Sequence, residues 1–225
     1  MWHDIQVNKK SEYIIGIDEA GRGPLAGSVY VGVVALPKNY KSVFKKTNTP
    51  KKLADSKKLS EKQREEWFSW IQKNKILYAY ATATPKQIDT INIARACDCA
   101  AQKAYNKLTT KNQKLKTNNR KQIKQGGARV IADGGITISV QKNIVFQHYP
   151  KADELIPAVS LASIVAKVKR DAYMKRMHVE YPHYAFDVHK GYGTKKHYHA
   201  LYQHGLSPIH RLTFLRSLHR IQKRK

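Results

Sequence analysis

The sequence feature that most constrains this chain is an apolar run that ends in two adjacent carboxylates and a glycine-rich turn. The run Tyr13–Ile17 has the length and composition of a buried strand. Asp18 and Glu19 follow it directly, and the turn sequence Gly21–Pro24 comes next. Carboxylates are scarce in this chain, with 16 Asp and Glu against 42 Lys and Arg. Two acids at the end of an apolar run are therefore hard to explain by solvation alone.

The alternation of side chains along a strand limits how Asp18 and Glu19 can act together. Successive side chains point to opposite faces of a sheet. Both acids serve one site only if the backbone twists, bulges or ends there. The glycines of the turn favour such a bend and let backbone N–H groups approach a phosphate or a sugar. The alternative is a simple strand and turn whose acid pair faces solvent.

The charge balance favours a polyanionic partner, because Lys and Arg displace counterions from phosphates. The formal net charge is +26, and 13 tyrosines are available to stack on bases or sugars. We expect nucleic acid as the partner, and the alternative is that the basic surface only aids solubility. A membrane partner is not expected, because no apolar run approaches the roughly 18 residues that a spanning helix needs.

Length and cysteine usage indicate a single cytoplasmic domain. A chain of 225 residues with 41% apolar content fits one domain with at most a small appendage. The N-terminus lacks the charged and apolar pattern of a signal peptide. Cys97 and Cys99 lie two residues apart on a predicted helix, so we expect reduced thiols in place of a disulfide or a zinc site.

Apolar runs and turn signals predict a mixed α/β sheet covered by helices. The predicted strands are residues 13–18, 28–36, 76–83, 129–133 and 143–146, of which the first two are expected to pair antiparallel. Helices are predicted to begin at the capping box of Ser60, at Pro85 and near Pro157. Further helices are predicted over residues 91–107, around His197 and over the basic tail 210–220.

Two basic segments are predicted to lack regular structure. Residues 38–52 are rich in lysine and flanked by prolines, which is typical of a loop. Residues 108–127 are polar, basic and nearly devoid of apolar side chains, which predicts a flexible insertion. Contact with phosphates and simple solvation both remain open for this insertion.

Two further acids fit the needs of a hard divalent cation, which takes carboxylate and phosphate oxygens. Asp133 ends a second apolar strand that is followed by glycine, and Asp153 precedes a long helix. Asp171 competes for this role, but it lies about 27 Å beyond Asp153 if the intervening residues are helical. We therefore expect Asp171 to pair with a neighbouring Lys or Arg.

Four carboxylates in one cluster repel each other unless a cation neutralises them or one acid stays protonated. Two cations in such a site are suited to in-line hydrolysis of a phosphodiester, because they activate water and stabilise the departing oxygen. This chemistry needs no histidine base, although the chain contains ten histidines.

An ordered set of motifs resembles the ribonuclease HII family, the type 2 ribonucleases H. The motifs are Gly16–Pro24, Asp55–Leu59, Val130–Gly134, Lys151–Asp153, Ser160–Val168 with Arg170 and Asp171, Lys190–Thr194, and His210 with Arg211. They follow the family's order along the chain, which makes the match specific. The resemblance implies a ribonuclease H-like mixed sheet flanked by helices, with a C-terminal helical extension.

The resemblance also implies an activity and a set of site residues. The activity is endonucleolytic cleavage of RNA in RNA–DNA hybrids and at single ribonucleotides in duplex DNA, leaving 3′-hydroxyl and 5′-phosphate ends. The four catalytic carboxylates map to Asp18, Glu19, Asp133 and Asp153, which would bind two Mg²⁺ or Mn²⁺. Residues expected to bind the substrate are Gly21, Arg22 and Gly23 at the 2′-hydroxyl, Tyr192 on the following sugar, and Lys57 and Lys58 at phosphates. An ordinary solvated pair is the alternative for the two lysines.

Some residues depart from the family pattern. Gly135 stands where the family usually has Asn, Ala152 where it has Gly, and Leu161 where it has Ala. Because all four acids are present, we expect an active enzyme. These three changes put the geometry of the metal site in question.

We expect one catalytic domain over residues 1–190, which includes the insertion, and a helical part over 191–225 that packs on it. The expected assembly is a monomer with no obligate protein partner. We expect no further substrate-binding domain before residue 13, which favours this family over the related ribonucleases HIII.

Three alternative functions remain. Another nuclease of the same fold, such as a resolvase, is disfavoured by the Gly21–Gly23 and Lys190–Gly193 motifs. A non-catalytic RNA-binding protein would use the acids only as structural caps. A histidine-based ribonuclease would cleave in chelator and leave cyclic phosphate ends.

Overall fold

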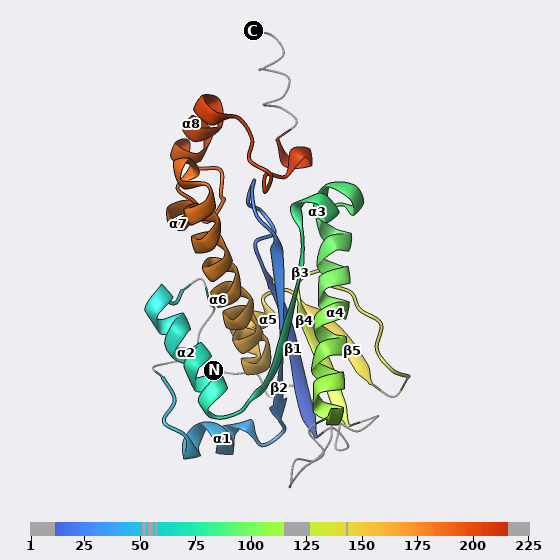
Figure 1. Cartoon of the computed structure of the whole chain (residues 1–225). Coiled ribbons are helices and arrows are strands. Elements are labelled where there is room, and N and C mark those ends of the chain that lie inside the picture. The colour runs from blue at the N-terminus through green and yellow to red at the C-terminus, as the bar shows by residue number, and fades with distance from the viewer. Residues whose placement is uncertain are drawn as a thin grey trace.

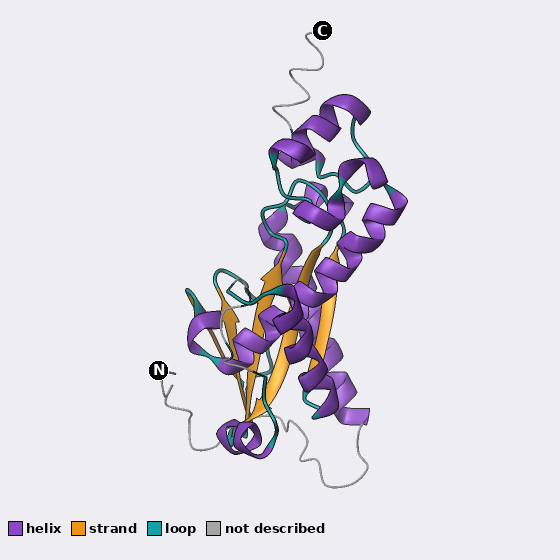
Figure 2. Cartoon of the chain, turned by 90° about the vertical axis from the view of Figure 1, so that its left-hand side faces the viewer, coloured by secondary structure: helices purple, strands orange, loops and turns teal. Residues whose placement is uncertain are grey.

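A five-stranded mixed sheet forms the centre of the fold (Figures 1 and 2). The structure is a computed structural model that describes residues 12–50, 53, 56, 58–114, 127–142 and 144–215. The strands are β1 (Tyr13–Ala20), β2 (Val29–Pro37), β3 (Leu77–Ala83), β4 (Ala128–Asp133) and β5 (Val145–Tyr149). These bounds confirm all five predicted strands within a few residues.

The sheet has the strand order β3-β2-β1-β4-β5, so β1 lies in the middle. β1 pairs antiparallel with β2, as predicted, and β2 pairs antiparallel with β3. On its other side β1 runs parallel to β4, and β4 runs parallel to β5. The parallel pairing brings the C-terminal ends of β1 and β4 to the same edge of the sheet.

The helices confirm most of the sequence predictions. They are α1 (Tyr40–Lys46), α2 (Glu61–Lys73), α3 (Pro85–Ile91), α4 (Ile93–Lys114), α5 (Ala152–Leu155), α6 (Pro157–Glu180), α7 (Phe186–His189) and α8 (Lys195–His204), with 3-10 turns at Pro182–Tyr184 and Leu212–Phe214. Ser60 and Gln63 form the predicted capping box at the start of α2. None of the helices in the described part of the chain is long and apolar enough to cross a membrane.

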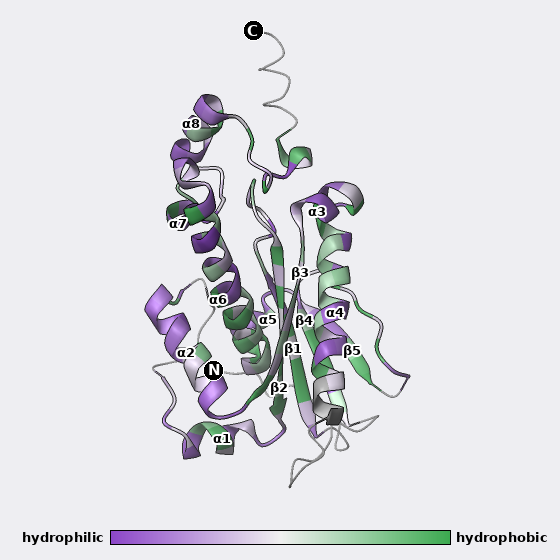
Figure 3. Ribbon diagram, in the orientation of Figure 1, coloured by the Kyte–Doolittle hydropathy of each residue, from purple (hydrophilic) through white to green (hydrophobic). Residues whose placement is uncertain are grey.

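Two helical layers cover the sheet. α4 packs on one face, over β2 and β3, and α6 packs on the other face, over β1 and β2, with α2 against it (Figure 1). The core on the α4 side includes Ile15 and Ile17, and the core on the α6 side includes Ile14 and Ile131. Figure 3 shows the strands largely hydrophobic and α2 largely hydrophilic, as expected for a sheet buried between layers.

Three segments differ from the sequence predictions. The predicted loop at 38–52 contains α1, whose Val43 and Phe44 pack against the core on the α6 side. α4 continues to Lys114, seven residues into the predicted flexible insertion, because Leu108 is buried in the core on the α4 side. Residues 115–126 lie outside the described part of the chain.

The predicted tail helix at 210–220 is the third difference. In the described part of this segment, residues 210–215, His210 makes a β-bridge with Ala26 and a short 3-10 turn follows at Leu212–Phe214. The Asp89 carboxylate holds the start of this segment by accepting hydrogen bonds from the backbone N–H groups of Leu212 and Thr213 at 2.9 Å. Residues 216–225 lie outside the described part.

The C-terminal part lies beyond one end of the sheet (Figures 1 and 2). A third apolar cluster joins Leu201 of this part to Phe186 of α7, to Met174 of α6 and to Leu25 and Ala26 of the turn after β1. The C-terminal part therefore packs on the same core elements that carry the glycine-rich turn.

Two glycines set the distance between α6 and the sheet. A Cβ atom on Gly16 would lie 2.1 Å from the carbonyl carbon of Ala158, and one on Gly32 would lie 2.2 Å from the carbonyl oxygen of Ala162. Both contacts are with helix backbone, which cannot move aside as a flexible side chain can. Only glycine allows α6 to pack this closely on β1 and β2.

We predict that Gly32→Ala destabilises the fold, because the new methyl group must displace the backbone of α6. We expect the free energy of unfolding to fall by at least about 2 kcal/mol, as measured by urea unfolding. Gly135→Ala is the matched control, because a Cβ atom there meets nothing within 4 Å. Equal stability of the two variants would contradict this account of the α6 packing.

Candidate active site

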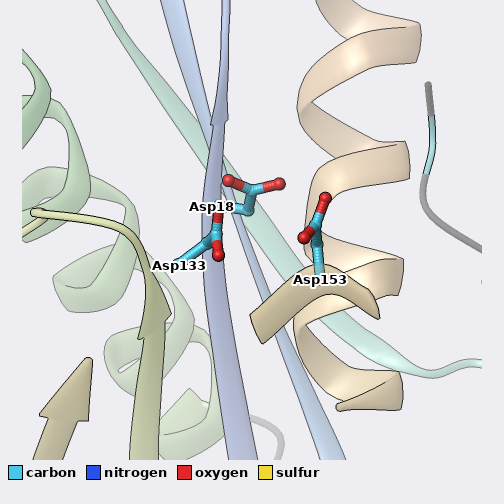
Figure 4. A group of neighbouring side chains, drawn as sticks. All are labelled: Asp18, Asp133 and Asp153. Carbon is cyan, nitrogen blue, oxygen red and sulfur yellow. The ribbon is translucent and has the colours of Figure 1, made fainter. Parts of the chain in front are cut away.

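Three of the predicted acids gather at the edge of the sheet (Figure 4). Asp18 comes from β1, Asp133 from the end of β4, and Asp153 from the short helix α5. One carboxylate oxygen from each lies within 4.8 Å of the others. Asp18 and Asp153 are buried, and Asp133 is partly exposed, so the group opens to solvent on one side.

The period of the strands explains why Asp18 and Asp133 meet. Ile14 on β1 and Ile131 on β4 both face α6, and Asp18 and Asp133 are an even number of residues further along their strands. Because β1 and β4 are parallel neighbours, these two acids project from the same face at the same edge.

Glu19 occupies the opposite side of β1. The ladder between β1 and β2 continues without a bulge through Glu19 and Ala20. Among the described residues Glu19 is not a member of the three-carboxylate group. The structure therefore brings together three of the four predicted acids, and the shared role of Glu19 stays a prediction.

Hydroxyl groups beneath Asp18 hold its carboxylate in place. Ser163 of α6 hydrogen-bonds the Asp18 side chain, and the Ser163 hydroxyl lies 2.7 Å from that of Ser56. Both serines are buried. Ser56 belongs to the segment between α1 and α2, so this contact also ties that segment to the site.

Backbone contacts position the other two acids. The N–H of Ala152 donates to Asp133 Oδ1 at 2.7 Å, which joins the end of β4 to the start of α5. The Ser160 hydroxyl donates to the backbone carbonyl of Asp153. The first turns of α5 and α6 are thus fixed against the strand that carries Asp133.

Burial and mutual repulsion make the charged form of this cluster costly. Burial raises the pKa of Asp18 well above its ordinary value, and the negative charge of Glu19 raises it further. The hydrogen bond from Ser163 acts in the opposite direction. Such a cluster is stable at neutral pH with all its charges only if a cation neutralises it.

Glu19 is also held in an unfavourable environment. Burial raises the pKa of Glu19, while the Arg22 guanidinium, 3.3 Å from Glu19 Oε1, lowers it. The other carboxylate oxygen of Glu19 is buried and has no hydrogen-bond partner. This orphaned anionic oxygen belongs to the residue after Asp18, and oxygen ligands of this kind suit hard cations such as Mg²⁺ and Mn²⁺.

The turn after Glu19 is anchored by Arg211. This buried side chain donates to the carbonyls of Gly21 at 2.6 Å, Arg22 at 2.9 Å and Gly27 at 2.9 Å. Burial lowers the pKa of Arg211 to about 10, so the guanidinium remains cationic at neutral pH.

A second buried guanidinium joins this turn to the segment that carries Tyr192. Arg170 of α6 donates to the carbonyls of Ala26 and Ser28 at 3.3 Å and to that of Lys190 at 2.9 Å. Gly21 has a φ of +96°, and a Cβ atom on it would lie 2.0 Å from Arg170 Nε. Only glycine fits at this position.

The anchored carbonyls fix the direction of the backbone N–H groups. In a planar trans peptide the C=O and N–H point in opposite directions. Because Arg211 binds the carbonyls of Gly21 and Arg22, the N–H groups of Arg22 and Gly23 point away from Arg211. This arrangement offers two backbone donors to a hydroxyl or a phosphate oxygen.

Tyr192 lies beside the turn. A Cβ atom on Gly23 would be 4.0 Å from the Tyr192 ring, and the Arg170 guanidinium carbon lies 5.9 Å from the ring centroid. The Tyr192 side chain is 45% exposed, which leaves part of the ring free for a ligand. The structure therefore brings together Gly23 and Tyr192, which were both predicted to bind the substrate.

The remaining predicted residues are placed as follows. Lys58 Nζ lies 3.3 Å from Glu154 Oε1, next to Asp153 in the sequence, and is largely exposed. Lys57 lies outside the described residues. Asp171 makes the predicted ion pairs, with Lys167 Nζ at 2.8 Å and Arg64 at 3.5 Å, and this prediction is confirmed.

Sequence reasoning gave no role to several residues that build the site. Ser163, Arg170 and Arg211 occur in the quoted motifs, but their partners are backbone carbonyls and a carboxylate far away in the chain. A polar residue among the small residues of α6 is the signal that could have found Ser163. Nothing in the local pattern of a basic chain distinguishes a buried arginine from the many exposed ones.

The chain matches known proteins over most of its length. A model of the family described as Ribonuclease HII matches residues 15–217. Ribonuclease HII of Hydrogenovibrio crunogenus is 40% identical over 203 residues, which cover 90% of this chain and 86% of that protein.

Solved structures share the fold. The ribonuclease H2 from Pyrococcus horikoshii OT3 aligns with a TM-score of 0.65 and 23% identity, covering 95% of this chain and 100% of that one. Bst-RNase HIII in complex with Mn²⁺ aligns with a TM-score of 0.66 and 14% identity, covering 96% of this chain and 72% of that one. The fold class predicted from the sequence is thereby confirmed. Because the family model spans most of its length, the chain belongs to the ribonuclease HII family and is a metal-dependent endoribonuclease.

Proposed function

We propose that this enzyme hydrolyses the RNA strand of RNA–DNA hybrids and also cleaves at single ribonucleotides embedded in duplex DNA, leaving 3′-hydroxyl and 5′-phosphate ends. The observation that carries the proposal is the position of the three-carboxylate group next to a turn with two outward N–H donors. A phosphodiester and its neighbouring 2′-hydroxyl are adjacent in RNA, so both features can contact one ribonucleotide.

The acids would hold the metal. Asp18, Asp133 and Asp153 each bring one carboxylate oxygen within 4.8 Å of the others. Glu19 would join them only if the end of β1 twists, because it lies on the opposite side of the strand. Two bound divalent cations, Mg²⁺ or Mn²⁺, would supply water activation and stabilisation of the departing oxygen. The residues Ser163 and Ala152 fix the orientation of the carboxylates before substrate arrives.

The glycine-rich turn would select ribose. The N–H groups of Arg22 and Gly23 are directed away from Arg211 and can donate to a 2′-hydroxyl oxygen, which a deoxyribose lacks. The exposed part of the Tyr192 ring would stack on the sugar of the following deoxynucleotide. Lys58, and Lys57 beside it, would contact a phosphate.

The decisive experiment uses a DNA duplex that contains one ribonucleotide. We expect cleavage at that position with Mg²⁺ or Mn²⁺, no cleavage of the all-DNA control, and 3′-hydroxyl and 5′-phosphate product ends. A resolvase would cut DNA junctions without a ribonucleotide. A purely RNA-binding protein would give no products, and a histidine-based ribonuclease would work in chelator and leave cyclic phosphates.

We predict that Asp18→Asn lowers the cleavage rate by more than about 100-fold, because loss of a metal ligand should cost more than loss of an outer-shell partner. Hybrid binding should be retained. The same variant should melt at a higher temperature than the unaltered chain when both are free of metal, because burial already disfavours the Asp18 charge. Full turnover of this variant at saturating Mg²⁺ would contradict the assignment.

We predict that Tyr192→Ala impairs selectivity more than affinity. Loss of the ring should reduce cleavage at a single ribonucleotide by about tenfold, the effect of one lost stacking contact, while binding to plain duplex DNA changes little. Arg22→Ala should lower this cleavage much less, because it keeps the backbone N–H groups of residues 22 and 23. Rates and dissociation constants on both duplexes provide the measurement. Equal losses on the two substrates would count against these roles.

A further inference from the structure

Three buried histidines lie directly behind the segment that carries Tyr192. They are His189 at the end of α7, His197 in α8 and His210 before Arg211. The rings of His189 and His197 stack with centroids 4.4 Å apart, and those of His197 and His210 are 5.2 Å apart. None of the three is part of the three-carboxylate group, so the proposed chemistry leaves them without a role.

The hydrogen bonds determine which ring nitrogen of each histidine carries a proton. His197 Nδ1 lies 2.9 Å from the carbonyl oxygen of Tyr192, which can only accept, so Nδ1 donates. His210 Nδ1 accepts from the backbone N–H of Ser207 at 2.8 Å. In neutral rings, His210 Nε2 therefore carries the proton and donates it to His197 Nε2, 2.9 Å away.

The pair holds this arrangement because both rings stay neutral. Burial lowers the pKa of His197 and of His210 to about 4. Protonation of His197 would place two N–H groups against each other at the His197–His210 contact, and protonation of His210 would place its Nδ1–H against the N–H of Ser207. At neutral pH the direction of the chain of hydrogen bonds is therefore fixed, from Ser207 through His210 and His197 to Tyr192.

This chain of hydrogen bonds lies between the two parts of the proposed ribose site. One end of the chain is the carbonyl of Tyr192, whose ring lies beside Gly23. On the other side of the His197–His210 contact, His210 directly precedes Arg211, which anchors the carbonyls of the glycine-rich turn. The His197–His210 bond thus fixes the distance between Tyr192 and the anchor of the turn.

We propose that His197 and His210 are positioning residues that hold Tyr192 against the glycine-rich turn and so set the preference for a ribonucleotide followed by a deoxynucleotide. This inference rests on the proposed function, because it assigns the histidines to the selectivity of that same site. Neither histidine touches the reacting atoms. Their contribution is the orientation of the Tyr192 backbone.

A role in packing alone makes a different prediction from a role in hydrogen bonding. His197→Phe keeps an aromatic ring of similar size but removes both ring hydrogen bonds. His197→Asn loses volume, but its amide nitrogen occupies the place of Nδ1 and can still donate to the Tyr192 carbonyl. If packing alone matters, Phe is the milder change, and if positioning matters, Asn is the milder change for selectivity.

The experiment measures kcat/KM on a duplex with one ribonucleotide and on a continuous RNA–DNA hybrid, and takes their ratio. We expect His197→Phe to lower this ratio by about tenfold, the effect of one lost hydrogen bond, and His197→Asn to lower it less. His199→Phe is the matched control, because His199 lies exposed on the same helix. Melting temperatures identify loss of fold, and the ratio is unaffected by the fraction of folded enzyme.

A double-mutant cycle with Tyr192→Ala separates this inference from the proposed function. If His197 acts through Tyr192, His197→Phe should not change the ratio further in the Tyr192→Ala background. An unchanged ratio in Tyr192→Ala itself would overturn the proposed role of Tyr192. A changed ratio in Tyr192→Ala with additive effects of the two substitutions, or a milder effect of Phe than of Asn, would overturn the positioning role alone.

Discussion

The close contact between α6 and the central strands is the constraint on which the site depends. Gly16 and Gly32 leave the helix backbone in direct contact with β1 and β2. At this distance Ser163 reaches the Asp18 carboxylate, and Arg170, two turns further along, reaches the turn after β1. α6 therefore positions both Asp18 and the glycine-rich turn relative to the sheet.

The site places a concentrated negative charge in a strongly basic protein. The formal net charge of +26 attracts polyanions from any direction, but it does not align them. The buried acids repel phosphate unless a cation intervenes, and burial and their mutual repulsion raise the pKa of Asp18. The net positive charge of the protein attracts the nucleic acid, whereas the buried acids repel its phosphates. Productive binding therefore depends on a bound metal as well as on the net charge.

Much of this arrangement could be predicted from the sequence, because local patterns specify it. The period of β1, the glycines after Glu19 and Asp133 and the capping box at Ser60 all act within a few residues. The sequence does not determine whether a bulge forms at Glu19, and a bulge would change the side of β1 on which Glu19 lies. The regular ladder with β2 shows that β1 has no bulge there. The tail conformation depends on Asp89, which is more than 100 residues away.

The carbonyl anchoring by Arg211 has a consequence for how the enzyme could change its preference for sugars. The donors that would meet the substrate belong to the main chain, and every amino acid supplies the same N–H group. Substitution of the exposed side chain of residue 22 leaves those backbone donors in place. An enzyme redesigned to accept another sugar would therefore need a different backbone conformation of the glycine-rich turn, which requires a change at the buried Arg211.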